Sequence, residues 1–166
     1  MSEVWDTTTA ARLRPDSAVL AYARERREGN VPVALSASTL SEIAHGLRKA
    51  ALAGSAAAAA QLGWLRDQID AGLVDVLPFD DCAAELAGAL RADTPTPPPA
   101  ARRARARSKA ETRVAWMLDL QTAATAFVHG YDLISGDAHH AHIAARLAAL
   151  APDAPGLRVT PPPRFG

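Results

Sequence analysis

Short apolar runs alternate along the chain with longer stretches in which apolar residues recur every three or four positions. The short runs are typical of buried strands, and the longer alanine-rich stretches are typical of helices. The predicted strands are residues 3–5, 31–36, 73–79, 131–135 and 157–160. The predicted helices are residues 17–29, 38–54, 56–72 and 80–93, a helix that opens at residue 117, and residues 138–149.

Capping residues mark several of these boundaries. Asp16 or Ser17 precedes the first long helix and Gly29 follows it, while Asp80 or Asp81 opens the helix after residues 73–79. Such residues satisfy the backbone groups that a helix leaves unpaired at its ends.

Strands that are separated by helices of this length imply a parallel sheet with helices on both faces. We therefore predict an α/β fold, a three-layer α/β/α sandwich whose central sheet is mostly parallel. The strand order does not follow from this pattern. A length of 166 residues fits one domain over residues 1–166, with a proline- and arginine-rich insertion at about residues 94–113.

The bulk composition excludes several classes of protein. Lys+Arg and Asp+Glu are 18 each, so a nucleic-acid partner would have to meet a local basic patch. The single cysteine, Cys82, excludes an internal disulfide and a zinc site made of thiolates. The N-terminal residues contain no long apolar stretch, so we expect a soluble cytoplasmic protein without a membrane span.

Four acidic residues fall near one edge of the predicted sheet. Asp6 directly follows the first strand, and Asp137 lies two residues after residues 131–135. We place Glu42 in the first turn of the helix after residues 31–36. We place Asp119 near the end of its helix that approaches the same edge. Ligands of open parallel sheets bind beyond the carboxyl ends of the strands, so these four carboxylates are expected to converge there.

Carboxylates at such short distances repel one another unless they are protonated or neutralised by a cation. Hard oxygen ligands select Mg²⁺, with Mn²⁺ as the alternative. Each acid also has a structural interpretation that stays open at this point. Asp6 could cap a turn, Glu42 could form a capping box with Thr39, Asp119 could face solvent, and Asp137 could belong to a turn.

Four segments together carry a resemblance to a known family. They are VWDTTTAARL (residues 4–13), LSASTLSEIAHGL (35–47), VDVLPFDDCAAELAGAL (74–90) and LDLQTAATAFVHGYDLISGDAHHAHI (118–143). In this order they resemble PIN-domain proteins, and more narrowly the VapC-type toxin ribonucleases of bacterial type II toxin–antitoxin pairs. The portion AATA…HG…LIS is the most specific part of the match.

The resemblance implies a metal-dependent endoribonuclease that hydrolyses RNA phosphodiester bonds with Mg²⁺ or Mn²⁺. It implies a cognate VapB-like antitoxin as partner and a homodimer. The acids that match the family's motifs are Asp6, Glu42, Asp119 and Asp137.

Within that set, Asp6, Asp119 and Asp137 are expected to be the principal metal ligands. Glu42 is expected to bind a second ion or to hold a water. Thr7 and Ser135 are expected to donate hydrogen bonds that support the acids.

The chain departs from the family pattern at two places. The stretch TTTAA after Asp6 is more polar and smaller than usual. His139 and His140 stand where a pair ending in phenylalanine is frequent, so the usual aromatic side chain is missing. His139 could touch a substrate phosphate, although a solvated histidine is the simpler interpretation. The other histidines have no spacing typical of a zinc site.

The insertion carries a cluster of arginines after a proline run. As an RNA-binding hypothesis, these cations hold substrate phosphates; the alternatives are a solvated loop and a docking site for an acidic antitoxin tail. The candidate residues are Arg102, Arg103, Arg105 and Arg107.

A rival interpretation of another class also remains open. The chain could be a catalytically silent PIN-like module that binds RNA or protein. A phosphatase of the haloacid-dehalogenase type is excluded because Thr8 stands where its second aspartate is required. A phosphate-binding loop is excluded because no glycine-rich turn follows the first strand.

Overall fold

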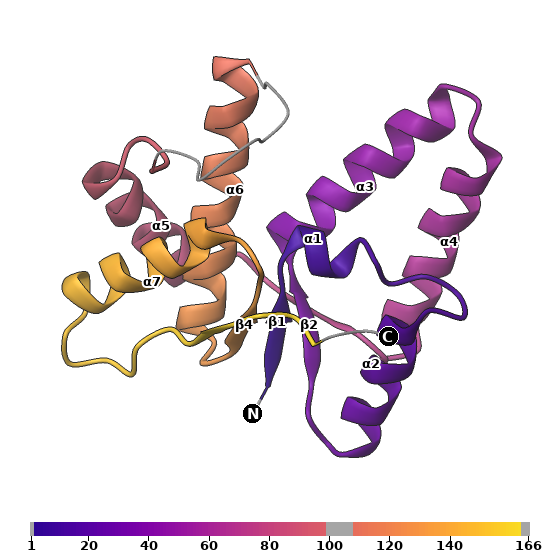
Figure 1. Ribbon diagram of the computed structural model, residues 1–166, viewed down its shortest axis with the longest axis horizontal. Coiled ribbons are helices and arrows are strands. Elements are labelled where there is room, and N and C mark those ends of the chain that lie inside the picture. Colours follow the sequence, from indigo (N-terminus) through magenta and orange to yellow (C-terminus); the bar gives the residue numbers. More distant parts are fainter. Residues whose placement is uncertain (1, 99–107, 164–166) are drawn as a thin grey trace.

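The computed structural model describes residues 2–98 and 108–163, and its centre is a five-stranded, all-parallel sheet. The strand order is β3-β2-β1-β4-β5 (Figure 1). The strands are β1 (Glu3–Trp5), β2 (Val33–Ser36), β3 (Asp75–Leu77), β4 (Asp132–Ile134) and β5 (Val159–Thr160). All five predicted strands are present, each within its predicted range, and the predicted α/β fold is confirmed.

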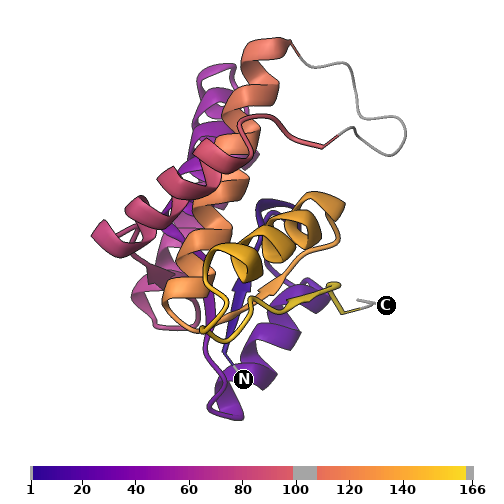
Figure 2. The same ribbon diagram turned by 90° about the vertical axis from the view of Figure 1, so that its left-hand side faces the viewer.

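Helices cover both faces of the sheet. The described helices are α1 (Thr7–Ala10), α2 (Ala18–Glu28), α3 (Ala37–Leu52), α4 (Ala56–Asp70), α5 (Asp81–Asp93), α6 (Lys109–Val128) and α7 (Ala138–Leu150). In Figure 1, α5, α6 and α7 lie to the left of the sheet, and α1 to α4 lie to its right. Figure 2 shows α6 running the full height of the left-hand layer.

Two cores form because alternate strand residues point to opposite faces of the sheet. Val4 and Leu133 belong to the core under α5, α6 and α7. Trp5 and Ile134 belong to the core under α1, α2 and α4. Trp5 and Trp116 are 0% and 2% exposed, so both are core residues.

Each described helix is preceded by a residue whose side chain accepts a hydrogen bond from the backbone two or three residues ahead, as the capping pattern predicts. For the two boundaries with two candidates, the caps are Ser17 and Asp80. At α6, Ser108 and Glu111 form a reciprocal capping box. That helix therefore begins eight residues before the predicted residue 117, within the segment assigned to the insertion. The charged stretch before residue 117 lacks the apolar periodicity that would have revealed it.

The strand order creates a switch point between β1 and β4. From β1 the chain builds β2 and β3 on one side, and then crosses to build β4 and β5 on the other. The Asp6 backbone N–H donates to the Ile134 carbonyl at 3.1 Å, which extends the pairing of β1 and β4 to the carboxyl edge of the sheet. A crevice at such a switch point is where parallel α/β sheets bind ligands.

Two sequence predictions concern features away from the sheet. Arg102, Arg103, Arg105 and Arg107 lie outside the described residues. Among the described helices, none combines the length and the apolar character that crossing a membrane requires.

Candidate active site

Asp6 directly follows β1 at the carboxyl edge of the switch point and is 4% exposed. Its Oδ1 accepts from the Thr9 backbone N–H at 2.7 Å, so Asp6 does cap the short helix α1. Its Oδ2 accepts from the Ser135 hydroxyl at 2.5 Å. Each carboxylate oxygen can accept two bonds, so capping leaves Asp6 able to bind a cation.

Ser135 connects Asp6 to the segment that follows β4. Its Oγ accepts from the Asp137 backbone N–H at 3.0 Å and lies 2.8 Å from His140 Nδ1. Asp137 is the N-cap of α7, and its Oδ1 accepts from the His139 backbone N–H at 2.8 Å. One buried hydroxyl thereby fixes the first and last of the four predicted acids relative to each other.

Asp119 lies in the middle of α6, and the expectation that it lies near the helix end was wrong. The nine steps along the chain from Asp119 to Val128 span about 14 Å of helix. A three-residue strand such as β4 spans only about 10 Å. Because the strands are this short, a mid-helix position is already level with their carboxyl ends. His139 Nδ1 lies 3.4 Å from Asp119 Oδ2, and His140 Nε2 lies 3.9 Å from Asp119 Oδ1.

The charge state of Asp119 reflects these surroundings. Burial and the nearby negative charges of Asp137 and Glu42 together raise the pKa of Asp119 to about 7, while His139 opposes them. Burial also lowers the pKa of His140, against the opposing effect of Asp6 and Asp137. The carboxylates are thus close enough to disfavour one another's ionisation, and a cation would relieve this.

Glu42 lies in the second turn of α3, so the prediction of the first turn was wrong. Ser36 caps this helix by accepting from the Thr39 backbone N–H, which moves the helix start upstream of the predicted start. The capping-box interpretation of Glu42 is wrong for the same reason. Glu42 Oε2 instead accepts from the Thr7 hydroxyl at 2.6 Å.

A buried cluster of three hydroxyls joins the helices that carry Glu42 and Asp119. Ser36 Oγ lies 3.1 Å from Thr122 Oγ1 and donates to Thr39 Oγ1 at 3.0 Å. Thr122 is on α6, one turn after Asp119. These bonds hold α3 against α6 below the two acids.

The four acids supply the hard oxygen donors that a divalent cation prefers. The raised pKa of Asp119 indicates that the neighbouring negative charges repel one another, so the residues present fit such a cation. Their oxygens are not gathered tightly, however. In the described part of the chain, the group of three whose ligand atoms all lie within 4.8 Å of one another is Asp80, Asp81 and Cys82. At this spacing, not all of the acids can contact one ion directly, and the others would reach it through the water ligands that Mg²⁺ usually retains.

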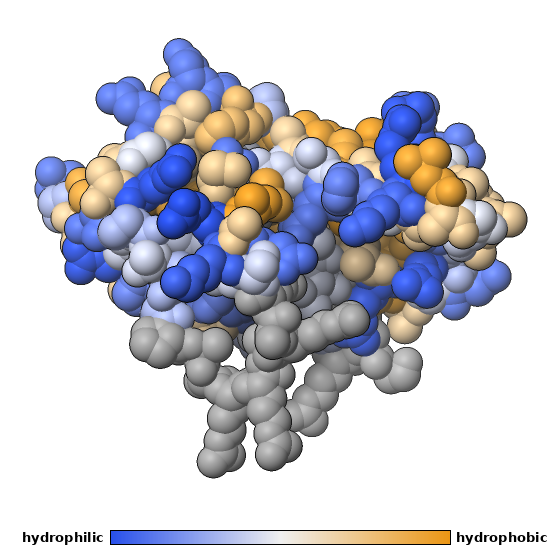
Figure 3. Space-filling view, turned by 90° about the horizontal axis from the view of Figure 1, so that it is seen from above, coloured by the Kyte–Doolittle hydropathy of each residue, from blue (hydrophilic) through white to orange (hydrophobic). Residues whose placement is uncertain are grey.

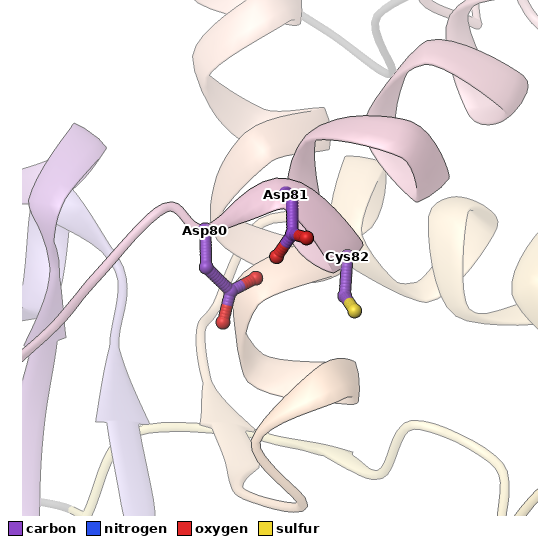
Figure 4. A group of neighbouring side chains, drawn as sticks. All are labelled: Asp80, Asp81 and Cys82. Carbon is purple, nitrogen blue, oxygen red and sulfur yellow. The ribbon is translucent and has the colours of Figure 1, made fainter.

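The group of Asp80, Asp81 and Cys82 was not predicted to bind metal (Figure 4). It lies at the start of α5, on the surface. Asp80 Oδ1 accepts from the Ala83 backbone N–H at 2.9 Å, and Asp80 Oδ2 lies 3.3 Å from His129 Nε2. One oxygen of Asp80 thus caps the start of α5, and the other contacts His129, the residue that ends α6.

A hollow of about 410 Å³ opens beside Glu42, between α1, α3 and α4. Thr7, Glu42 and Gly46 are among the residues that line it. A Cβ built on Gly46 would meet nothing within 4 Å. Seen from above the carboxyl edge, this face carries mostly hydrophilic residues with smaller hydrophobic groups among them (Figure 3).

A comparison with models of known protein families identifies the family of this chain. The family model described as PIN domain matches residues 4–146, a range that includes all four acids. The chain belongs to the PIN domain family. The family resemblance seen in the sequence is thereby confirmed.

Solved structures of VapBC and FitAB complexes share this PIN fold. VapBC2 from Rickettsia felis, bound to a DNA fragment from its promoter, matches with 15% identity and a TM-score of 0.59, covering 97% of this chain and 98% of the other. DNA-bound VapBC from Salmonella typhimurium matches with 19% identity and a TM-score of 0.55, with the same coverage. FitAcB from Neisseria gonorrhoeae matches with 20% identity and a TM-score of 0.53, covering 95% of both chains. A comparison with curated protein sequences gives no match.

His140 is the residue of this site that the sequence did not reveal. It is 3% exposed and contacts Ser135, and the sequence analysis assigned it no role. The one available signal was that His139 and His140 stand where the resembled family often has a pair ending in phenylalanine.

Proposed function

We propose that this PIN domain is a divalent-metal-dependent endoribonuclease that acts as the toxin of a toxin–antitoxin pair. The observation that carries the proposal is the meeting of Asp6, Asp119 and Asp137 at the switch point of the sheet. They come from three chain segments and are linked through Ser135, His139 and His140. Glu42 adds a fourth negative charge that raises the pKa of Asp119.

In this proposal Asp6, Asp119 and Asp137 hold Mg²⁺ or Mn²⁺. When bound, the cation supplies a more acidic water and stabilises the negative charge that develops on the phosphoryl oxygens. Ser135 fixes the Asp6 carboxylate and Thr7 fixes that of Glu42, so that both acids are oriented before the substrate arrives. In the proposal, Glu42 accepts a hydrogen bond from the attacking water.

The test is cleavage of a mixed RNA pool by the purified chain with Mg²⁺, with Mn²⁺ and with EDTA. We expect metal-dependent cleavage that is lost in Asp6→Asn and in Asp119→Asn. Asp153→Asn is the matched control, since Asp153 is exposed and lies outside the group of four acids. Cleavage that persists in EDTA, or in both site variants, would contradict the proposal.

A catalytically silent binding module is the second candidate. The wide spacing of the acid oxygens is the observation that favours it. Under this alternative, the folded protein cleaves no RNA with any divalent metal, and the two site variants bind RNA as well as the wild type does.

The proposed partners are an RNA substrate, a VapB-like antitoxin and a second copy of the chain, in the cytoplasm. The similarity of this fold to chains solved within VapBC and FitAB complexes supports the antitoxin. We expect expression of this chain alone to inhibit growth, and co-expression of a small protein encoded by the adjacent gene to restore it. Light scattering of the purified protein tests the homodimer.

A further inference from the structure

His140 brings an unused nitrogen into the acidic site. It lies in the first turn of α7 and is buried, and its Nε2 has no hydrogen-bond partner among the described residues. Unpaired polar atoms are rare in protein interiors because each one costs the solvation it has lost. The nearest charged group to Nε2 is Asp119, whose Oδ1 lies 3.9 Å away.

The hydrogen bonds of Ser135 determine which ring nitrogen of His140 carries the proton. The Ser135 hydroxyl donates its only hydrogen to Asp6, and its oxygen accepts the Asp137 backbone N–H. With no donor left on Ser135, the 2.8 Å contact with His140 requires Nδ1–H to be the donor. In the neutral imidazole, Nε2 then carries a lone pair that faces the Asp119 carboxylate.

The separation of these two electron-rich atoms suits a shared cation. A distance of 3.9 Å is too long for a hydrogen bond. Two ligands that each lie about 2.1 Å from one ion are about 3.0 Å apart when adjacent and about 4.2 Å apart when opposite. The observed distance falls between these limits.

We propose that His140 Nε2 is a nitrogen ligand of the divalent cation held by Asp119 and Asp6, and that it shifts the preference of the site from Mg²⁺ toward Mn²⁺. The inference rests on the proposed function, because it assigns a further ligand to the same metal site. Imidazole nitrogen suits transition metals, whereas Mg²⁺ prefers oxygen ligands. An acidic site that includes a nitrogen therefore binds Mn²⁺ more tightly, relative to Mg²⁺, than an all-oxygen site does.

His139 is the competing source of nitrogen at this site. Its Nδ1 lies 3.4 Å from Asp119 Oδ2 and 3.7 Å from Asp137 Oδ1. It already has these carboxylates as partners, and its side chain is 26% exposed. His140 is buried deeper, is oriented by Ser135, and keeps its nitrogen unpaired, which favours it as the ligand.

The experiment loads the full-length chain with Mn²⁺ alone and measures electron spin-echo modulation, which detects nitrogen bound directly to manganese. His140→Asn is the decisive variant, because its amide nitrogen replaces Nδ1 as donor to Ser135 while Nε2 is removed. His140→Phe restores an aromatic of similar volume, in case the amide unfolds the site. His139→Asn tests the competitor, and His142→Asn is the control on the same helix.

We expect nitrogen modulation in the wild type, in His139→Asn and in His142→Asn, and its loss in both His140 variants. We also expect the Mn²⁺ dissociation constant of the His140 variants to rise roughly tenfold or more, with a smaller change for Mg²⁺. Modulation that survives in the His140 variants would overturn the inference. So would wild-type Mn²⁺ binding without modulation, which would leave the proposed function intact. If Asp6→Asn instead binds Mn²⁺ as tightly as the wild type does, the proposed acidic metal site itself is rejected.

Discussion

At Asp119, the proposed function and the stability of the fold oppose each other. The carboxylate must be ionised to hold a cation, yet burial and the charge of Asp137 raise its pKa to about 7 from an ordinary value of 3.8. In the metal-free protein, folding therefore favours the protonated form. The stability that this group contributes is fully present below about pH 4 and is lost as the pH rises through 7.

Asp119→Asn should remove this pH dependence. In EDTA, we expect the variant to gain thermal stability relative to the wild type between pH 5 and pH 8, by a few degrees in the unfolding midpoint. Thermal unfolding followed by circular dichroism measures the difference, and Asp153→Asn is the control. An equal difference between variant and wild type at both pH values would show that the charge of Asp119 does not oppose folding.

Ser135 acts on three neighbours through one hydroxyl. Ser135→Ala deprives Asp6 of a donor, and leaves the Asp137 backbone N–H and His140 Nδ1 without their acceptor. We expect a loss of about 1–3 kcal/mol in the free energy of unfolding. We also expect a decrease of about 10- to 100-fold in metal affinity. Urea unfolding and calorimetric titration with Mn²⁺ measure the two effects. Ser135→Thr keeps the hydroxyl and should retain most of both; equal losses in Ala and Thr would contradict the role of the hydroxyl.

At the scale of elements, β1 is tied to α2 by a buried carboxylate at the end of the strand opposite Asp6. Glu3 is 5% exposed, accepts from the Tyr22 hydroxyl at 2.9 Å and pairs with Arg26. Burial, together with the hydrogen bond to Glu3, raises the pKa of Tyr22 to about 12. The folded state therefore favours the neutral phenol, and this stability is lost as the pH rises from 10 through 12.

The raised pKa of the Tyr22 phenol can be tested directly. In a near-ultraviolet titration, the amplitude that is missing in Tyr22→Phe should correspond to a group titrating near pH 12. Glu3→Gln should lower the pKa of Tyr22 part of the way toward 10, because it removes the negative charge but not the burial. An unchanged Tyr22 titration in Glu3→Gln would exclude the carboxylate as a cause.

The sequence predicted the elements better than their positions relative to one another. All five strands follow from local apolar runs such as VALS, and caps such as Ser17 mark helix starts. The shared edge of the acids follows from the parallel sheet, which local pattern alone implies. The depth of Asp119 depends on how short the strands are. The contact of His140 depends on which face of α7 turns inward. Both are set by long-range packing, which no local pattern records.

At the scale of the whole molecule, the equal numbers of acidic and basic residues raise the question of where RNA would bind. A chain with 18 residues of each sign attracts RNA only through local concentration of its cations. The insertion provides such a concentration in the sequence, just before the helix that carries Asp119. Its RNA-binding role stays a prediction, because its arginines lie outside the described residues.

Replacing Arg102, Arg103, Arg105 and Arg107 together with glutamine tests this role. If these cations hold phosphates, RNA affinity should fall uniformly across sequences, and the dependence of log affinity on log salt should flatten by about 0.7 for each lost contact with a single strand. The matched control replaces four exposed cations elsewhere, Arg24, Lys49, Arg66 and Arg91, so that the net charge changes equally. Fluorescence anisotropy at several salt concentrations measures both variants. Equal losses would assign the effect to overall charge, and an unchanged salt slope in the insertion variant would remove the insertion from RNA binding.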